Sequence, residues 1–352
     1  MKRKLFSFNL IALLMLSSFV FAKGQSNEKQ KVINKNYSVN AGDKLNIENQ
    51  FGKVVVETWE KNEISVEITL KASAKSEAKS LELLEGIKIN ETKAGGAVYL
   101  KTQLPNNVYN TGKQSMTVDY TVKMPANSPL ALTNKFGNVY MGVFKANLQL
   151  NVSYGSIRIQ KLQGDNKRIN VSFGSADIDE LDEADIESKY SKLNIEKLQN
   201  AEIRNQFGKT YINEANVLRI TQKYGDLDLR KVNTIIGTIE FANIDVDALG
   251  KSAELNLKYS GNADLGVIGA GVDLIKINAG FSTVYMKFSE SNAFDFSARL
   301  KFGDLKLNNQ RIDNFVKTNN ETTHEKEYKG KVGNGGKGNL ILDGNYTTIY
   351  FQ

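Results

Sequence analysis

The sequence predicts an all-β protein, specifically a parallel β-solenoid (β-helix) with coils of about 17 to 22 residues and a β-rich amino-terminal cap. Three observations lead to this fold: an aromatic–glycine motif that recurs along the chain, strand-type alternation on both sides of it, and almost no helical periodicity. An antiparallel β-sandwich or meander is the alternative, because a 17-residue unit also accommodates two antiparallel strands.

The repeat is an aliphatic residue, three mostly polar residues, an aromatic residue, a small residue, and aliphatic residues three and five positions after the aromatic. From Phe136 to Tyr259 the aromatic residues are 18, 19, 17, 17, 17, 17 and 18 positions apart. The repeat aromatics are Phe51, Phe136, Tyr154, Phe173, Tyr190, Phe207, Tyr224, Phe241, Tyr259, Phe281, Phe302 and Tyr346. The glycines that follow them are Gly52, Gly137, Gly155, Gly174, Gly208, Gly225 and Gly303.

The apolar positions on the two sides of each aromatic have opposite parity, so one straight strand would expose half of them. We therefore expect a corner directly after the aromatic, with glycine supplying backbone angles that other residues avoid. Ser191, Ala242, Ser260 and Ser282 occupy this position elsewhere, so the corner does not always need a positive φ. Stacked repeats would place each ring on the next and form one continuous core.

The remaining segments divide the chain. Residues 1–22 have the charged start, short apolar run and small exit residue of a signal peptide. Residues 23–129 hold the first repeat and a cap with one helix at 75–85, and 130–307 form the repeat array. Residues 308–338 are polar and glycine-rich, which predicts a flexible loop, and 339–352 form a terminal coil that closes the array.

Composition narrows the function classes. There is no cysteine, which excludes disulfides and thiolate chemistry. Three of the 46 basic residues lie in 1–22, which leaves 43 against 39 acidic residues without a dense basic block. We therefore expect no nucleic-acid partner, and no membrane-spanning segment once the signal peptide is removed.

Candidates for chemistry are few. The single histidine, His324, lies in a polar segment where we expect a solvated side chain. Paired aspartates project in the same direction from second strands and could form an acidic stripe for calcium or for sugar cleavage. They are Asp177, Asp179, Asp226, Asp228, Asp245 and Asp247.

Arg158 and Lys306 occupy matching positions in other coils, which favours an ordinary charged surface over an acidic stripe. The outward tyrosines Tyr140, Tyr211 and Tyr285, and also Trp59, could stack on sugars, although cross-strand packing explains them as well. No catalytic residue, cofactor or metal site is predicted.

Several segments resemble the secreted putative-adhesin family, β-strand-repeat proteins of unknown function from Gram-negative bacteria. They are Asn-Gln-Phe-Gly-Lys-Val-Val-Val-Glu-Thr-Trp at 49–59, the units at 135–139 and 223–227, Met-Pro-Ala-Asn at 124–127, and Glu-Tyr-Lys-Gly-Lys-Val-Gly at 327–333. The resemblance covers essentially the whole chain after residue 22. It implies a β-solenoid and export, and it supplies no mechanism and no catalytic residues.

The expected function is that of an exported, adhesin-like binding or structural protein, periplasmic or at the cell surface, whose repetitive surface meets a glycan or an envelope protein. An envelope scaffold or sensing partner is the first alternative. A polysaccharide lyase or hydrolase on a β-helix is the second.

Overall fold

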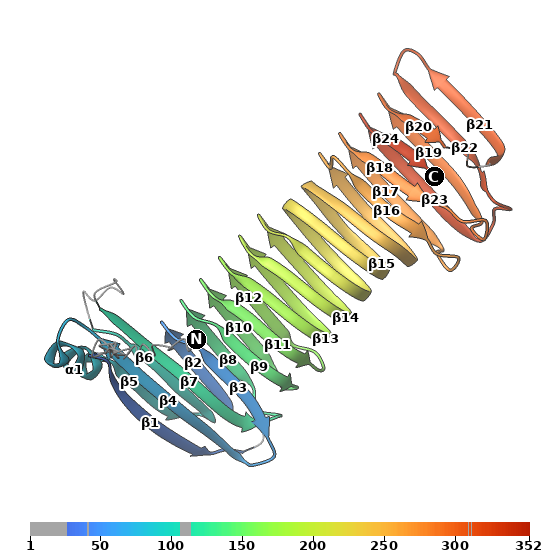
Figure 1. Ribbon diagram of the computed structural model, residues 1–352. Helices are drawn as coiled ribbons and strands as arrows, with labels where there is room; N and C mark the ends of the chain where they lie inside the picture. Colours follow the sequence, from blue (N-terminus) through green and yellow to red (C-terminus); the bar gives the residue numbers. More distant parts are fainter. Residues whose placement is uncertain (1–26, 41, 106–113, 309, 311) are drawn as a thin grey trace, which may run out of the picture.

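The computed structural model describes residues 27–40, 42–105, 114–308, 310 and 312–352. Within this part of the chain the protein is all-β, with one short helix near the amino terminus and a large, mostly parallel sheet. The body is elongated, with the amino-terminal strands at one end and the carboxy-terminal strands at the other (Figure 1). The predicted signal peptide, 1–22, lies outside the described residues.

Each repeat, here called a rung, contributes one strand before its aromatic residue (face one) and one after it (face two). Three long strands pass through both faces: β13 (Ser175–Lys189), β14 (Lys192–Gln206) and β15 (Thr210–Lys258).

The other strands of face one, from the amino-terminal end, are β5 (Lys88–Ala94), β6 (Ala97–Gln103), β2 (Lys44–Gln50), β8 (Leu130–Lys135), β10 (Leu148–Ser153), β12 (Lys167–Ser172), β17 (Leu274–Gly280), β23 (Gly338–Asn345), β19 (Phe294–Lys301), β22 (Glu325–Val332) and β21 (Ile312–Asn320).

The other strands of face two are β1 (Lys29–Ser38), β4 (Glu63–Ser73), β7 (Ser115–Pro125), β3 (Val54–Trp59), β9 (Val139–Phe144), β11 (Ser156–Leu162), β16 (Ala263–Ile268), β18 (Thr283–Lys287), β24 (Thr348–Phe351) and β20 (Asp304–Leu307).

Equivalent strands of successive rungs pair in parallel and in register. Leu150 lies opposite Leu132 on one side and Ile169 on the other, and Ile157 lies opposite Val139 and Ala176. Among the described residues, antiparallel pairing is confined to the two ends, where β1–β4–β7, β5–β6 and β19–β22–β21 meet. The rungs of the array are therefore not antiparallel hairpins, contrary to the alternative that the sequence left open.

The core between the faces is mainly aliphatic, with a few buried aromatics such as Phe144 and Phe351, and the repeat aromatics are not part of it. Leu150, Ile169 and Ile186 are completely buried. Eleven of the twelve repeat aromatics, by contrast, are 44–53% exposed. The expectation of rings stacked inside the core is therefore wrong about their location: the rings do stack, but along an outer edge of the molecule.

The backbone of the aromatic residue itself explains this. All twelve repeat aromatics have a φ between 50° and 59°, the left-handed region, which turns the side chain outward after the inward-facing strand. Of the seven corner glycines only Gly225 has a positive φ. The sequence interpretation therefore assigned the unusual backbone angle to the wrong one of two neighbouring residues.

Glycine is needed at these corners because a side chain would not fit against the neighbouring rung. A Cβ on Gly137 would lie 1.9 Å from the carbonyl oxygen of Gly52, and one on Gly155 would lie 2.1 Å from that of Gly137. The rungs thus approach each other backbone to backbone at this corner. Ser191, Ala242, Ser260 and Ser282 show that some rungs leave room for a small side chain, and none of the four has a positive φ, as expected.

The carboxy-terminal end differs from the expected layout in two ways. Segment 308–338 contains β21 and β22, a hairpin that pairs with β19, where the sequence predicted only a loop. The terminal coil does not close the array: β23 lies between β17 and β19, and β24 lies between β18 and β20. The outermost rung is the one that carries Phe302.

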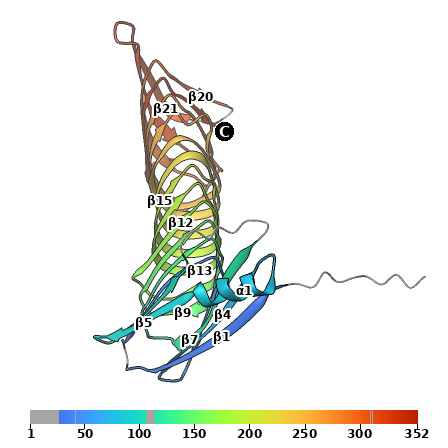
Figure 2. The ribbon, with the colours of Figure 1, turned by 90° about the vertical axis from the view of Figure 1, so that its left-hand side faces the viewer.

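The amino-terminal end holds the helix α1 (Glu77–Gly86), close to the predicted 75–85. Ser76 caps it, since its Oγ accepts a hydrogen bond from the Lys79 amide at 3.3 Å. Leu83 and Leu84 are buried, and the helix contacts β4 and β1 (Figure 2). Within the described ranges, no helix has the length and apolar character required to cross a membrane.

Candidate ligand-binding surfaces

The paired aspartates lie on face two, but they do not form one continuous stripe. Asp177 lies beside Arg158 on one side and Asn194 on the other, and Asn194 lies beside Tyr211. Two uncharged residues therefore separate Asp177 from the later aspartates.

Most of these carboxylates have cationic or amide partners. Arg158 Nη2 lies 2.6 Å from Asp179, and Asn194 Nδ2 donates to Asp177 at 2.6 Å. Lys209 Nζ lies 2.9 Å from Asp228 and 3.8 Å from Asp226, and Arg230 Nε lies 3.3 Å from Asp247. Such pairs are typical of a soluble strand face.

Asp245 is the exception among the six aspartates. Partial burial and the negative charges of Asp264, Asp247 and Asp228 raise its pKa above the ordinary value. Asp264, which lies opposite Asp245, was missed in the sequence because it follows its aromatic by five positions where the other rungs have four. No group of three metal-ligating side chains occurs in the part of the chain that the structure describes.

Two of the aromatic candidates on face two, Tyr285 and Trp59, have contacts within the molecule. Tyr285 stacks on Tyr350, with centroids 4.8 Å apart and an interplanar angle of 12°. The sequence did not suggest this pair, because the insertion of the terminal coil beside β18 could not be foreseen. Trp59 donates its indole N–H to the Glu63 carbonyl at 2.7 Å, and Lys61 Nζ lies 4.8 Å from its ring centroid.

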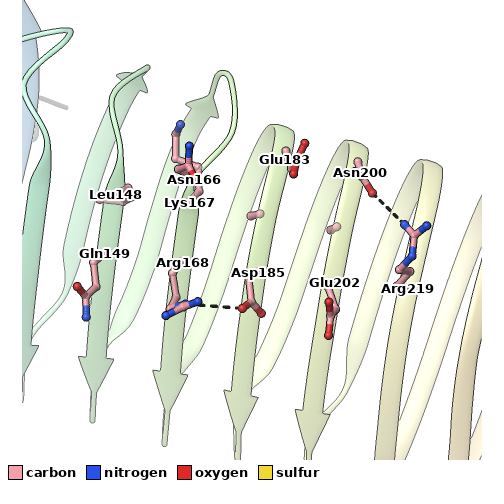
Figure 3. Close-up of a pocket in the computed structure, with 12 residues that line it drawn as sticks. Leu148, Gln149, Asn166, Lys167, Arg168, Glu183, Asp185, Asn200, Glu202 and Arg219 are labelled. Atoms are coloured by element: carbon pink, nitrogen blue, oxygen red, sulfur yellow. Dashed lines mark hydrogen bonds and ion pairs between the residues drawn. The ribbon is translucent and has the colours of Figure 1, made fainter.

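A groove of about 560 Å³ lies on face one, across β10, β12, β13, β14 and β15 (Figure 3). Its wall carries Arg168, Asp185, Glu202 and Arg219. Arg168 Nε lies 3.6 Å from Asp185, and Arg219 donates to Asn200 Oδ1 at 3.5 Å. Both guanidinium groups are thus only loosely held.

Lys167 lies in the same wall at a position where other rungs have an apolar residue. It is only 3% exposed, and its Nζ donates to the carbonyls of Asp165 at 2.6 Å and Lys145 at 3.1 Å. Burial lowers the pKa of its ammonium group. These contacts tie two turns together and leave Lys167 no evident role towards a ligand.

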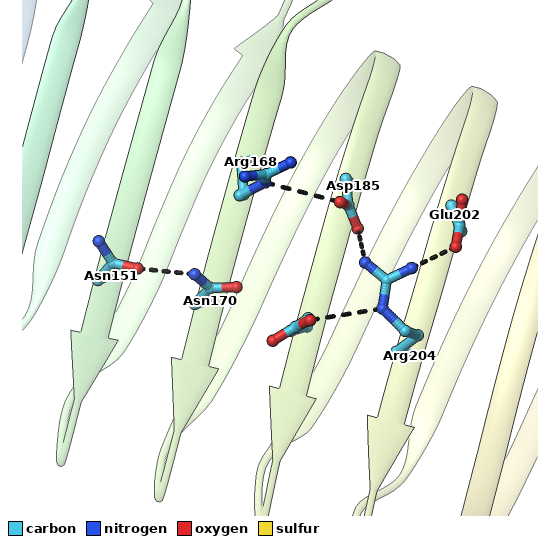
Figure 4. Close-up of polar contacts among 7 residues, drawn as sticks. Asn151, Arg168, Asn170, Asp185, Glu202 and Arg204 are labelled. Atoms are coloured by element: carbon cyan, nitrogen blue, oxygen red, sulfur yellow. Dashed lines mark hydrogen bonds and ion pairs between the residues drawn. The ribbon is translucent and has the colours of Figure 1, made fainter.

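Beside the groove, Arg204 connects three carboxylates (Figure 4). Its guanidinium lies 2.5 Å from Asp185 and 3.4 Å from Glu187, and it also pairs with Glu202. Asn170 donates to Asn151 at 2.7 Å, but its own Oδ1 has no partner among the described residues, because Glu187 is the residue opposite it in the next rung. Charged and amide side chains thus connect the rungs of face one.

The repeat aromatics form the third surface, here called the aromatic ridge. Their rings stack in eleven steps of 4.7–5.2 Å with interplanar angles of 2–12°. In space Tyr346 lies between Phe281 and Phe302, as the inserted terminal coil requires.

His324 extends the ridge. It lies at the turn between β21 and β22 with a φ of 54°, and its ring centroid is 5.0 Å from that of Phe302. The Phe302 amide donates to the His324 carbonyl at 3.0 Å. His324 is exposed as expected, but its ring continues the row of rings from the β21–β22 turn and is not a freely solvated side chain.

Comparison with known proteins gives a limited result. No protein-family model matches the chain, and no curated protein matches it. Among solved structures, a putative adhesin from Bacteroides fragilis is 12% identical, with 92% of this chain and 97% of that chain covered and a TM-score of 0.33.

Two more solved structures are similar. A putative adhesin from Parabacteroides merdae is 14% identical, covers 73% of this chain and 96% of its own, and has a TM-score of 0.36. One from Parabacteroides distasonis is 13% identical, covers 92% and 97%, and has a TM-score of 0.29. These values give no residue correspondence from which a role could be transferred, so a function has to be inferred from the residues of this chain.

Proposed function

We propose that the stacked rungs form a parallel β-solenoid and that the protein is an exported, non-enzymatic binding protein of the cell envelope or surface. Its repetitive exterior would engage a glycan or protein partner by many weak contacts along a rigid stack. The observation that carries the proposal is the aromatic ridge, an uninterrupted row of twelve stacked rings, eleven of which are about half-exposed.

The size of the ridge supports binding. A Phe or Tyr side chain has about 150–250 Å² to bury, so eleven half-exposed rings present on the order of 1,000 Å² of aromatic surface. The largest apolar patch of a typical monomer is about 300–600 Å². A continuous apolar surface of this size usually contacts another molecule.

The side chains of face two and of the groove on face one argue against catalysis. Catalytic acids and bases need a held geometry and a perturbed pKa, usually in a concave site. The face-two aspartates lie on an open strand face and are mostly paired with Lys or Arg. In the groove, Asp185 and Glu202 are held by Arg204.

The direct experiment incubates the purified chain without residues 1–22 with a glycan array and with an envelope extract, and records both binding and product release. Binding without turnover is the expected result. Release of oligosaccharide would overturn the proposal and favour a lyase or hydrolase. Capture of one envelope protein without any glycan binding would favour the scaffold or sensing alternative. Fractionation of cells that express the tagged chain tests export.

A further inference from the structure

The aromatic ridge has a regularity that follows the chain from Phe136 to Phe281 and is complete only in space. From Phe136 to the outermost rung, phenylalanine and tyrosine alternate without exception. The spatial order is Phe136, Tyr154, Phe173, Tyr190, Phe207, Tyr224, Phe241, Tyr259, Phe281, Tyr346 and Phe302.

Duplication of a two-rung unit along the chain does not account for the end of this order. In the sequence, Phe302 is the next repeat aromatic after Phe281, and Tyr346 is the last one. The alternation is completed only because the terminal coil inserts between these two rungs and places Tyr346 between the two phenylalanines. The pattern therefore belongs to the assembled surface.

Ring packing does not require the alternation either. The same molecule contains a Tyr–Tyr stack, Tyr285 on Tyr350, at 4.8 Å, and a Phe–Phe stack, Phe51 on Phe136, at 4.9 Å. Both spacings fall within the range of the mixed steps. Either residue type can thus follow either at this rung distance, and the positions of the hydroxyl groups need another reason.

The tyrosine hydroxyls are free to serve a ligand. Tyr154, Tyr190, Tyr224, Tyr259 and Tyr346 are 44–53% exposed, and no described residue hydrogen-bonds to their hydroxyl groups. Since rungs are about 4.8 Å apart, the hydroxyls recur about every 10 Å along a straight row. Each can donate one hydrogen bond and accept another.

We propose that the aromatic ridge binds an extended polysaccharide whose repeat is two sugars long, with one tyrosine hydroxyl contacting each repeat. This inference rests on the proposed binding function and specifies its ligand. In an extended β-1,4-linked chain successive six-membered sugars are turned over, so the same groups recur every second sugar, at nearly the distance of two rungs. A peptide strand repeats every two residues at about 6.6 Å and does not match the ridge.

The stacking also determines how a sugar can bind. Because both faces of each interior ring are covered by neighbouring rings, sugars contact ring edges and hydroxyl groups and do not stack on ring faces. Lys189, Lys223 and Lys258 directly precede three of the tyrosines, and thus add donors with the same two-rung period. Lys223 and Lys258 share Glu240, at 2.8 and 3.1 Å, which keeps this part of the ridge close to neutral.

The test uses calorimetry with the full chain that lacks residues 1–22. The probes are β-1,4-linked gluco-, xylo-, manno- and chito-oligosaccharides of two, four and six sugars, with α-1,4-linked malto-oligosaccharides as the control. Affinity for at least one β-linked series is expected to rise with each added disaccharide, and the coiled α-linked series is expected not to bind.

The decisive variant replaces all five ridge tyrosines by phenylalanine, which removes the hydroxyls and keeps the stack. A hexasaccharide meets three hydroxyls, so its affinity should fall about tenfold or more. The matched control, Tyr285→Phe with Tyr350→Phe, removes two stacked hydroxyls from face two and should leave affinity unchanged. Circular dichroism and the melting temperature verify that both variants fold.

Three outcomes overturn the inference. Either no β-linked series binds the wild-type chain, or the variant without the five hydroxyls binds as tightly as wild type, or the chain forms a dimer that depends on these hydroxyls, so that the ridge binds a second copy of the chain. If an envelope component binds equally to wild type and to the variant without the five hydroxyls, the polysaccharide assignment fails while the proposed binding function stands.

Discussion

The two residues at each corner, the aromatic and the small residue after it, are neighbours in the chain but obey different constraints. The small residue faces the inside of the stack, where the carbonyl of the adjacent rung leaves no room for a Cβ at Gly137 or Gly155. The aromatic faces outward with left-handed backbone angles that cost a non-glycine residue about 1–2 kcal/mol.

This difference shows which features of the corner are determined by packing. Backbone contact between rungs restricts the inner residue to glycine or, in some rungs, to another small residue. At the outer residue, stacking decides that a flat ring is present, since aromatic pairs contribute about 0.5–1.5 kcal/mol and offset the strained backbone. Stacking does not decide between Phe and Tyr. The hydroxyl groups are therefore the part of the corner that function can select.

The largest effect is expected inside the corner. Gly155→Ala places a methyl group 2.1 Å from the carbonyl oxygen of Gly137, and the three nearest atoms are all backbone atoms of Gly137, which cannot move aside as a flexible side chain could. We expect a loss of about 3 kcal/mol, measured as a lower urea midpoint. Ala242→Gly, at an equivalent corner that accepts a methyl group, should cost only about 1 kcal/mol. Equal effects of the two substitutions would mean that rung contact does not select glycine.

At the aromatic position, two substitutions separate the contribution of ring stacking to stability from that of the left-handed backbone. Tyr190→Ala removes two stacking contacts and keeps the strain of a φ near 50°, whereas Tyr190→Gly removes the same contacts and relieves the strain. We expect about 2 kcal/mol of destabilisation for alanine and about 1 kcal/mol less for glycine. Thermal unfolding decides the order, and a less stable glycine variant would contradict the left-handed corner.

The corner also shows how far the sequence could predict this molecule. The repeat, the parallel register, the helix near 77–86 and the need for a corner all follow from periodicity and parity. The direction of the aromatic could not be predicted from parity, because a single left-handed residue reverses it. The order of the last rungs could not be predicted either, because Tyr346 enters its place only through contacts with rungs far away in sequence.

The candidate site was predicted less well than the fold. The paired aspartates were visible as residues, but whether they adjoin depends on the register, which an extra residue before Asp264 shifts. The alternation of Phe and Tyr is also present in the sequence from Phe136 to Phe281. It gains meaning only once the rings are known to be on the surface.

The corner of the rung that carries Phe302 is sensitive to pH, because Asp304 there accepts a hydrogen bond from Tyr328 of the β21–β22 hairpin. Burial by itself would raise the pKa of Asp304, but hydrogen bonds from Tyr328, at 2.6 Å, and Lys306, with the charge of Lys326, lower it to about 2. A carboxyl group whose pKa is lowered in the folded state stabilises the folded protein at pH values above its pKa in the unfolded chain, which is about 3.9. This contribution is lost as the pH falls towards 2.

Asp304→Asn should therefore destabilise the protein by about 1 kcal/mol at pH 7 and have little effect near pH 2. Melting temperatures of wild type and variant across this range provide the measurement. A difference that stays constant with pH would show that the carboxylate charge is not what holds the β21–β22 hairpin at this corner.

The smallest effect is expected from the hydroxyl groups on the ridge. Tyr259→Phe removes a hydroxyl that is exposed and has no hydrogen-bond partner among the described residues, so stability should change by less than about 0.5 kcal/mol. Tyr328→Phe provides the contrast, because its hydroxyl donates to Asp304 and its loss should cost about 1 kcal/mol. Chemical denaturation of both variants compares them directly. If Tyr259→Phe costs as much as Tyr328→Phe, the ridge hydroxyls have a structural role after all. The alternation of Phe and Tyr would then be a product of packing and would not indicate a ligand with a matching repeat.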